Sequence, residues 1–250
     1  MSDKNVFAWS PYSDDRGLPL GGQVAENNIV EDIFSLGLPI DKANDRWLQY
    51  EGIQAALNGT HPSEGKEFAD EIKRTIEWMK HKPPLKYTSS FSKEKLEQHD
   101  VLNLSLFVPF GNQKTIQILE EICPNDYEAF PIKLHTSTGV SDRYYLINIT
   151  HEIYDSLDRT LSVYDLHFDS KDGEESPISS FDRLLFKENC MEDKFLGRIH
   201  EKLGYMLIKK KVMDVFEAKN IKGMNFEPLE DKINGVYKRN YKPDGVTLKY

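Results

Sequence analysis

The sequence predicts an α+β fold with a mostly antiparallel sheet and a few packed helices. Strand and helix patterns follow one another without the regular strand–helix–strand alternation that builds a parallel sheet. Several short segments in the second half alternate apolar and polar residues, which is typical of strands with one face on a core. A chain of 250 residues can also bury a sizeable core without disulfides or metals.

The first third of the chain holds one short strand pattern and one clear helix pattern. The stretch "NVFAWSPY", from Asn5, indicates a short strand. The helix begins at Ser63 or Glu64 and ends before the prolines at 83 and 84, which cannot continue it. Its apolar residues recur on one stripe: Phe68, Ile72, Ile76 and Met79. A polar segment over 86–100 then connects this part to the rest.

The second half alternates between strand and helix patterns. Helices are predicted over 112–123 and over the later part of 205–223, where we expect Gly223 to be the residue just past the helix end. Strands are predicted at 101–109, 127–136, 144–150, 181–189, 193–201, the start of 205–223, and 224–231. In the strand from Tyr144, alternation places Tyr145, Ile147 and Ile149 on one face and Tyr144, Leu146 and Asn148 on the other.

These patterns suggest three regions along the chain. Residues 1–95 form an N-terminal region that is either part of the same globule or a small lobe. Residues 96–230 form an α+β domain, and residues 231–250 form a polar, basic C-terminal extension.

Composition limits the classes of function. A net charge of −9 argues against nonspecific nucleic-acid binding and suits a basic partner, although it also serves solubility alone. The chain has no apolar run long enough for a membrane span and no secretory signal pattern, so we expect a cytoplasmic protein without membrane contact. Its two cysteines, Cys123 and Cys190, are then expected to be reduced.

Histidines offer the main alternative, a metal site. The stretch "HEIYD" at His151 matches a zinc-protease helix only in part, because Asp155 stands where the second histidine is needed. We therefore expect His151 and Glu152 to cap a strand at the surface. His135, His151 and His167 are evenly spaced, but no carboxylate accompanies them at a recurrent offset, so chance explains the spacing better than a three-histidine site.

Other catalytic patterns are missing from the sequence. It contains no Gly-x-Ser-x-Gly elbow and no phosphate-binding loop, and the glycine pair at 21 and 22 lacks the lysine that such a loop needs. Cys190 lies in the acidic stretch "KENCMED", which opposes thiolate formation. The sequence therefore favours a protein that works by binding, with no catalytic residue, metal or cofactor.

One segment carries a resemblance to a known family. The stretch "NITHEIYDSLDRTLSVYD" is similar to a hydrophobic strand that ends in asparagine and is followed by D-x-L-D-R-x-x-S, and "KNIKGMNFEPL" is similar to a closing G-x-x-F-x-P element. Over about 100–229 the chain resembles immunity protein family 11 of bacterial polymorphic-toxin systems, formerly a domain of unknown function. The residues that carry the resemblance are Asn148, Asp155, Leu157, Asp158, Arg159, Ser162, Gly223, Phe226 and Pro228.

The resemblance implies a cytoplasmic protein that binds and neutralises a cognate toxin domain, such as a nuclease. It also implies that the shared residues hold the fold, whereas the toxin-binding surface differs between members. The acidic loop at 168–177 is our candidate for contact with a basic toxin surface, through Asp169, Asp172, Glu174 and Glu175. Two alternatives remain open: a metal-dependent hydrolase that uses His135, His151 or His167, and a non-catalytic adaptor domain.

Overall fold

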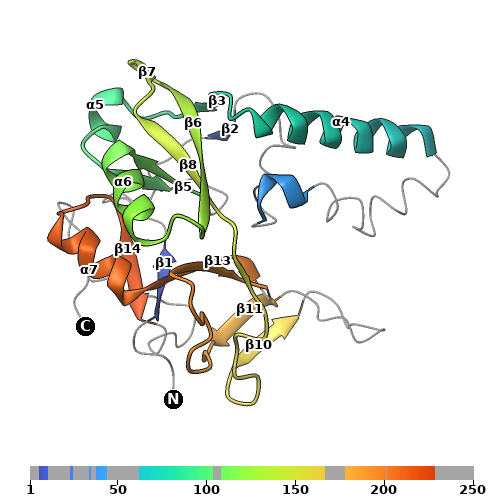
Figure 1. The fold of residues 1–250 in the computed structure, drawn as a ribbon, viewed down its shortest axis with the longest axis vertical. Helices are drawn as coiled ribbons and strands as arrows, with labels where there is room; N and C mark the ends of the chain where they lie inside the picture. Colours follow the sequence, from blue (N-terminus) through green and yellow to red (C-terminus); the bar gives the residue numbers. More distant parts are fainter. Residues whose placement is uncertain are drawn as a thin grey trace.

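The computed structural model describes residues 6–10, 23–24, 34, 38–43, 62–103, 108–166, 178–200 and 202–228. The predicted α+β fold is confirmed (Figure 1). Its sheets are mixed but mostly antiparallel, since the parallel pairs among the described strands are β3 with β6 and β9 with β12. The helices whose bounds the structure describes are α4 (Pro62–Lys80), α5 (Lys93–Leu96), α6 (Gln113–Ile122) and α7 (Lys210–Ala218), and residues 40–43 are helical as well.

The strands form three sheets within the described ranges. The seven-stranded sheet has the order β2-β3-β6-β8-β5-β4, with β7 beside β6. Its strands are β2 (Gln23–Val24), β3 (Leu85–Thr88), β4 (Val101–Asn103), β5 (Pro109–Asn112), β6 (Tyr127–Thr136), β7 (Gly139–Ser141) and β8 (Tyr144–Ile149). The five-stranded sheet has the order β14-β1-β13-β12-β9. Its strands are β1 (Val6–Ser10), β9 (Glu152–Ile153), β12 (Leu196–Ile199), β13 (Lys202–Lys209) and β14 (Asn225–Pro228). A two-stranded sheet pairs β10 (Val163–Leu166) with β11 (Ile178–Arg183).

Strand β8 confirms the predicted alternation. Tyr144 and Leu146 enter a hydrophobic cluster beneath α4, and Ile147 and Ile149 enter a second cluster on the opposite face. Period-two alternation thus gives one central strand two buried faces. In helix α4 the predicted apolar stripe is confirmed at Ile72, which is fully buried. The prediction was wrong at Phe68, which is exposed.

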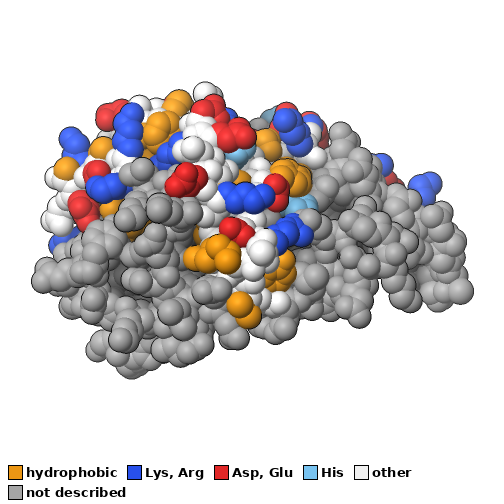
Figure 2. All heavy atoms as spheres, turned by 90° about the horizontal axis from the view of Figure 1, so that it is seen from below, with side chains coloured by type: hydrophobic (Ala, Val, Ile, Leu, Met, Phe, Trp, Pro, Cys, Tyr) orange, Lys and Arg blue, Asp and Glu red, His pale blue; other side chains and the backbone are white. Residues whose placement is uncertain are grey.

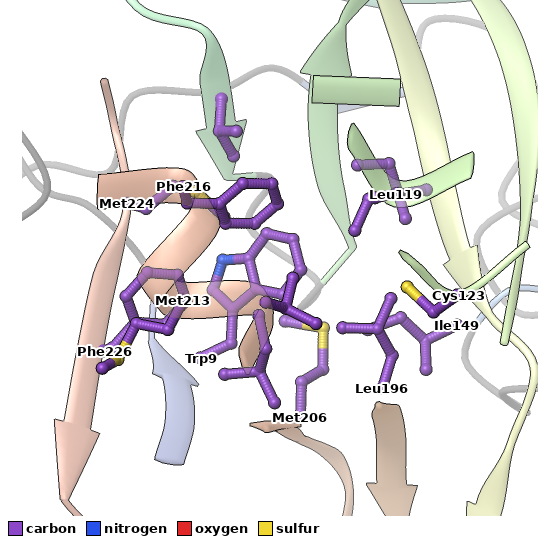
Figure 3. Packing of buried hydrophobic residues seen from close by; sticks show 14 of the residues in the cluster. Trp9, Leu119, Cys123, Ile149, Leu196, Met206, Met213, Phe216, Met224 and Phe226 are labelled. Carbon is purple, nitrogen blue, oxygen red and sulfur yellow. The ribbon is translucent and has the colours of Figure 1, made fainter. Parts of the chain in front are cut away.

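The second cluster fills the space between the two larger sheets (Figure 3). Trp9 from β1, Met206 from β13 and Phe226 from β14 face α7, which contributes Phe216. From the other side, α6 adds Leu119. Because β1 pairs with both β13 and β14, the start of the described chain lies between strands from its end.

A third cluster covers the other face of the five-stranded sheet. Val6 and Ala8 point into it from β1, and Leu207 from β13 joins them. Ile153 and Leu157 cover this face from the segment that carries the family resemblance. The segment that follows β9 therefore packs over the outer side of the five-stranded sheet through Leu157 and Tyr164.

The end of α7 differs from the prediction. Asn220, with φ of 51°, is the left-handed residue that ends the helix, and its N–H donates to the carbonyl of Glu217. The N–H of Ile221 donates to the carbonyl of Phe216, which completes a Schellman motif. Placing Gly223 at this position was wrong, because asparagine also takes the left-handed conformation and comes first.

Gly223 instead permits a close approach between two chain segments. Its φ is +91°, and a Cβ at this position would lie 2.0 Å from the carbonyl oxygen of Val101. The N–H groups of Asp100 and Val101 donate to the carbonyl of Lys222, whose own N–H donates to Oδ2 of Asp100. This double contact joins the segment before β14 to the start of β4.

Three other predicted segments differ in detail. The strand expected at 101–109 is two strands, β4 and β5, separated by residues 104–108, of which 104–107 lie outside the described ranges. The strand expected at 181–189 ends at Arg183, and Leu184 and Phe186 turn into the third cluster. The polar connector at 86–100 contains most of β3 and all of α5, and Leu96 is buried there.

Among the described helices, none is both long and apolar enough to cross a membrane.

Candidate functional site

A tight turn forms the centre of the segment that carries the resemblance. Oδ1 of Asp158 accepts hydrogen bonds from the N–H groups of Thr160 and Leu161. The hydroxyl of Ser162 accepts from the N–H of Leu185 and donates to its carbonyl. A short acidic side chain and a hydroxyl can each satisfy backbone groups locally in this way. The turn is thereby tied to the chain that follows β11.

Asp155 and Arg159 lie on the outside of this turn. Asp155 has a φ of 52°, and its carboxylate pairs with Lys187 at 2.6 Å. Both side chains of the pair are substantially exposed, so water screens the attraction. Arg159 is exposed as well. An exposed guanidinium is solvated in both the folded and the unfolded chain, so we expect Arg159 to add little to the stability of the fold.

A more enclosed polar group lies just before the turn. Nδ1 of His200 is 2.5 Å from Oε1 of Glu152, and the hydroxyl of Tyr154 donates to Oε2 of the same carboxylate at 2.6 Å. The rings of Tyr154 and His200 stack with centroids 4.4 Å apart. The Glu152 side chain is only 6% exposed, so the expectation that it caps a strand at the surface was wrong.

This arrangement defines what the group can do chemically. An ionised Glu152 carboxylate only accepts hydrogen bonds, so its contact with His200 requires the tautomer with the proton on Nδ1. The imidazole is then held in one tautomer and orientation, which suits either acid–base chemistry at Nε2 or a rigid surface.

Arg198 lies next to this group in the sheet. Arg198 lies opposite Glu152 in the parallel backbone register of β12 and β9, and its side chain is fully buried. Burial lowers the pKa of its guanidinium to about 10, which leaves it charged at neutral pH. A buried cation and a nearly buried anion thus occupy neighbouring positions at this edge of the described sheet.

Asn148 and Phe226, two more residues of the resemblance, are buried in the fold. Asn148 donates from Nδ2 to the carbonyl of Leu38 and to Oε2 of Glu128, which also accepts from the N–H of Ile40. Burial raises the pKa of the Glu128 carboxyl above its usual value. Phe226 is buried beside Trp9, and Pro228 pairs with Phe7 in the register of β14 and β1.

The three histidines of the metal hypothesis do not come together where they are described. His135 is near the end of β6, whereas His151 follows β8 beside the beginning of β6. The length of the strand separates them by roughly 25 Å. His167 lies outside the described residues, and no cluster of three or more metal-binding side chains occurs within them.

The cysteine and the acidic loop considered in the sequence differ in how far the structure describes them. Cys123 is a free, buried cysteine, and burial raises the pKa of its thiol to about 12, which opposes any nucleophilic role. The acidic residues proposed for toxin contact lie in 167–177, outside the described residues. They are Asp169, Asp172, Glu174 and Glu175.

No family model matches the chain, and no curated protein matches it.

Proposed function

We propose that this chain is a cytoplasmic immunity protein that binds and neutralises a cognate bacterial toxin domain. The observation that carries the proposal is the ordered series of sequence elements from 100 to 229 that resembles immunity protein family 11. The central element is the segment that runs from Asn148 to Ser162.

The positions of these residues support the proposal. Asp158 and Ser162 use their polar atoms to build one turn and to fasten it to Leu185. Gly223 occupies a place where any side chain would meet Val101. Such roles depend on the chemical type of each residue, as expected if the shared residues of a family hold the fold while its binding surface varies.

The charge of the chain supports a basic partner. A net charge of −9 speeds encounter with a positively charged protein, and a nuclease that holds phosphates presents such a surface. The four acidic residues between β10 and β11 are the proposed steering group. Neutralisation needs no reaction by this chain, since tight binding over the toxin's site is sufficient.

Co-expression tests the proposed function. The chain would be expressed in bacteria together with the C-terminal domain of a large secreted protein encoded directly upstream of it. We expect cells to survive with both proteins and to die with the toxic domain alone. Continued death with both proteins soluble would contradict the proposal, and so would the absence of any such upstream toxin gene.

A further inference from the structure

Exposed hydrophobic side chains concentrate on one segment of the described surface. Six large hydrophobic side chains are exposed within the described ranges, and three of them lie in residues 154–163. These three are Tyr154, Leu161 and Val163, at 58%, 51% and 49% exposure. Figure 2 views the molecule from the end at which β10 and β11 lie in Figure 1, and hydrophobic side chains are visible there among acidic and basic ones.

The segment has an inward and an outward side. Ile153 and Leu157 point into the third cluster, and Tyr164 packs against it. Their neighbours Tyr154 and Val163 point away, as expected where successive residues of an extended chain face opposite sides. The inward residues fix the segment on the five-stranded sheet, so its outward residues are presented on a packed support.

Tyr154 is held in place although most of its surface is exposed. Its hydroxyl donates to the nearly buried carboxylate of Glu152, and its ring stacks on His200. An aromatic side chain that is already fixed loses little entropy on binding, and tyrosines of this kind are frequent anchors of protein interfaces.

The charge of the neighbouring sequence indicates the kind of partner. Leu166 pairs with Ile178, so both ends of the acidic stretch 167–177 are attached at the same end of the β10–β11 pair. Val163 is about 10 Å from that point along β10. An exposed apolar surface on a chain with a net charge of −9 fits a partner with an apolar patch bordered by lysine and arginine.

We propose that the outward side of 154–163, with Tyr154 as its anchor, is the surface on which the basic toxin domain docks. This inference rests on the proposed function and names the place where it is exerted. The acidic stretch then steers the partner, and the exposed apolar side chains hold it.

Two matched substitutions of exposed valines test the surface. Val163→Arg places a cation on the proposed surface, and Val140→Arg places the same cation on β7, where Val140 is 46% exposed. The dissociation constant of each full-length variant for the purified upstream-encoded toxin domain would be measured by calorimetry, with a melting curve to verify folding. We expect Val163→Arg to weaken binding about tenfold or more and Val140→Arg to change it less than about twofold.

Tyrosine variants add an independent readout. Tyr154→Ala should weaken binding about tenfold or more, whereas Tyr154→Phe, which keeps the ring, should lose much less. If Val163→Arg lowers the melting temperature, Leu161→Ser replaces it, because that side chain is exposed and precedes β10. The wild type could bind the toxin domain while neither Tyr154→Ala nor the variant at residue 161 or 163 weakens binding. That result would overturn this surface and leave the proposed function intact. A wild-type protein that does not bind would overturn both.

Discussion

The carboxylate of Glu152 lies 2.5 Å from Nδ1 of His200, and these two residues join β9 to the turn that follows β12. The same carboxylate accepts the hydroxyl of Tyr154. One nearly buried anion therefore fixes two aromatic rings at the edge of the five-stranded sheet.

Glu152→Gln should lower the free energy of unfolding by about 1–2 kcal/mol, because the amide removes the charge that both contacts use. Tyr154→Phe removes only one hydroxyl and should cost about 0.5–1 kcal/mol. Urea denaturation of both variants measures the two losses. Equal stability of Glu152→Gln and wild type would show that the carboxylate holds neither ring.

Gly223→Ala should be among the most damaging small substitutions in the chain. The added Cβ would lie 2.0 Å from the carbonyl oxygen of Val101, and φ of +91° disfavours any L side chain. We expect a loss of about 2–4 kcal/mol, measured by urea denaturation. A loss below ~0.5 kcal/mol would contradict the close contact between Gly223 and β4.

Neighbouring substitutions in the turn should differ in their effects. Asp158→Ala removes the acceptor for the N–H groups of Thr160 and Leu161 and should cost about 1 kcal/mol. Arg159→Ala changes an exposed side chain and should stay within ~0.5 kcal/mol. Thermal unfolding of the pair compares them directly, and the opposite order of losses would refute this description of the turn.

Acid should weaken the fold through His99. Burial lowers the pKa of its imidazole, and the charges of Lys95 and Lys222 act in the same direction. The folded protein therefore keeps His99 neutral at a pH where the unfolded chain, with a pKa near 6.5, binds a proton. The stability that this provides is fully present above pH ~6.5 and is lost as the pH falls toward the folded pKa.

His99→Gln isolates this contribution, because every other titrating group is retained. The free energy of unfolding of the wild type, measured relative to that of His99→Gln, should decrease as the pH falls from about 7.5 to about 5.5. A free histidine gains its positive charge over this range. Urea denaturation at several pH values measures the difference. A difference that stays constant with pH would show that His99 does not titrate differently on folding.

The acidic stretch should control the rate of toxin association. Replacing Asp169 and Asp172 with Asn, and Glu174 and Glu175 with Gln, removes four negative charges. Association measured by stopped flow should slow about tenfold or more at low salt and change much less at high salt. An unchanged rate at low salt would exclude this stretch as the steering surface.

Local patterns predicted the elements that have a long, regular signal. The stripe along α4 and the alternation along β8 depend on residues close in sequence, so their periods reveal them. Glu152 and His200 are 48 residues apart in the sequence, and Glu152 lies in a strand of two residues. A strand that short has no periodic pattern from which the contact could be predicted. Asn220 was missed as the end of α7 because glycine is the stronger signal for that position, although asparagine also adopts it.

The affinity of the purified chain for the upstream-encoded toxin domain tests the central claim most directly. A neutralising protein must keep the toxin bound in the producing cell. We therefore expect a complex with a dissociation constant in the nanomolar range, which corresponds to a binding free energy of about −12 kcal/mol or tighter. Titration calorimetry at physiological salt gives this value. No binding at micromolar concentrations, with both proteins folded, would contradict the account.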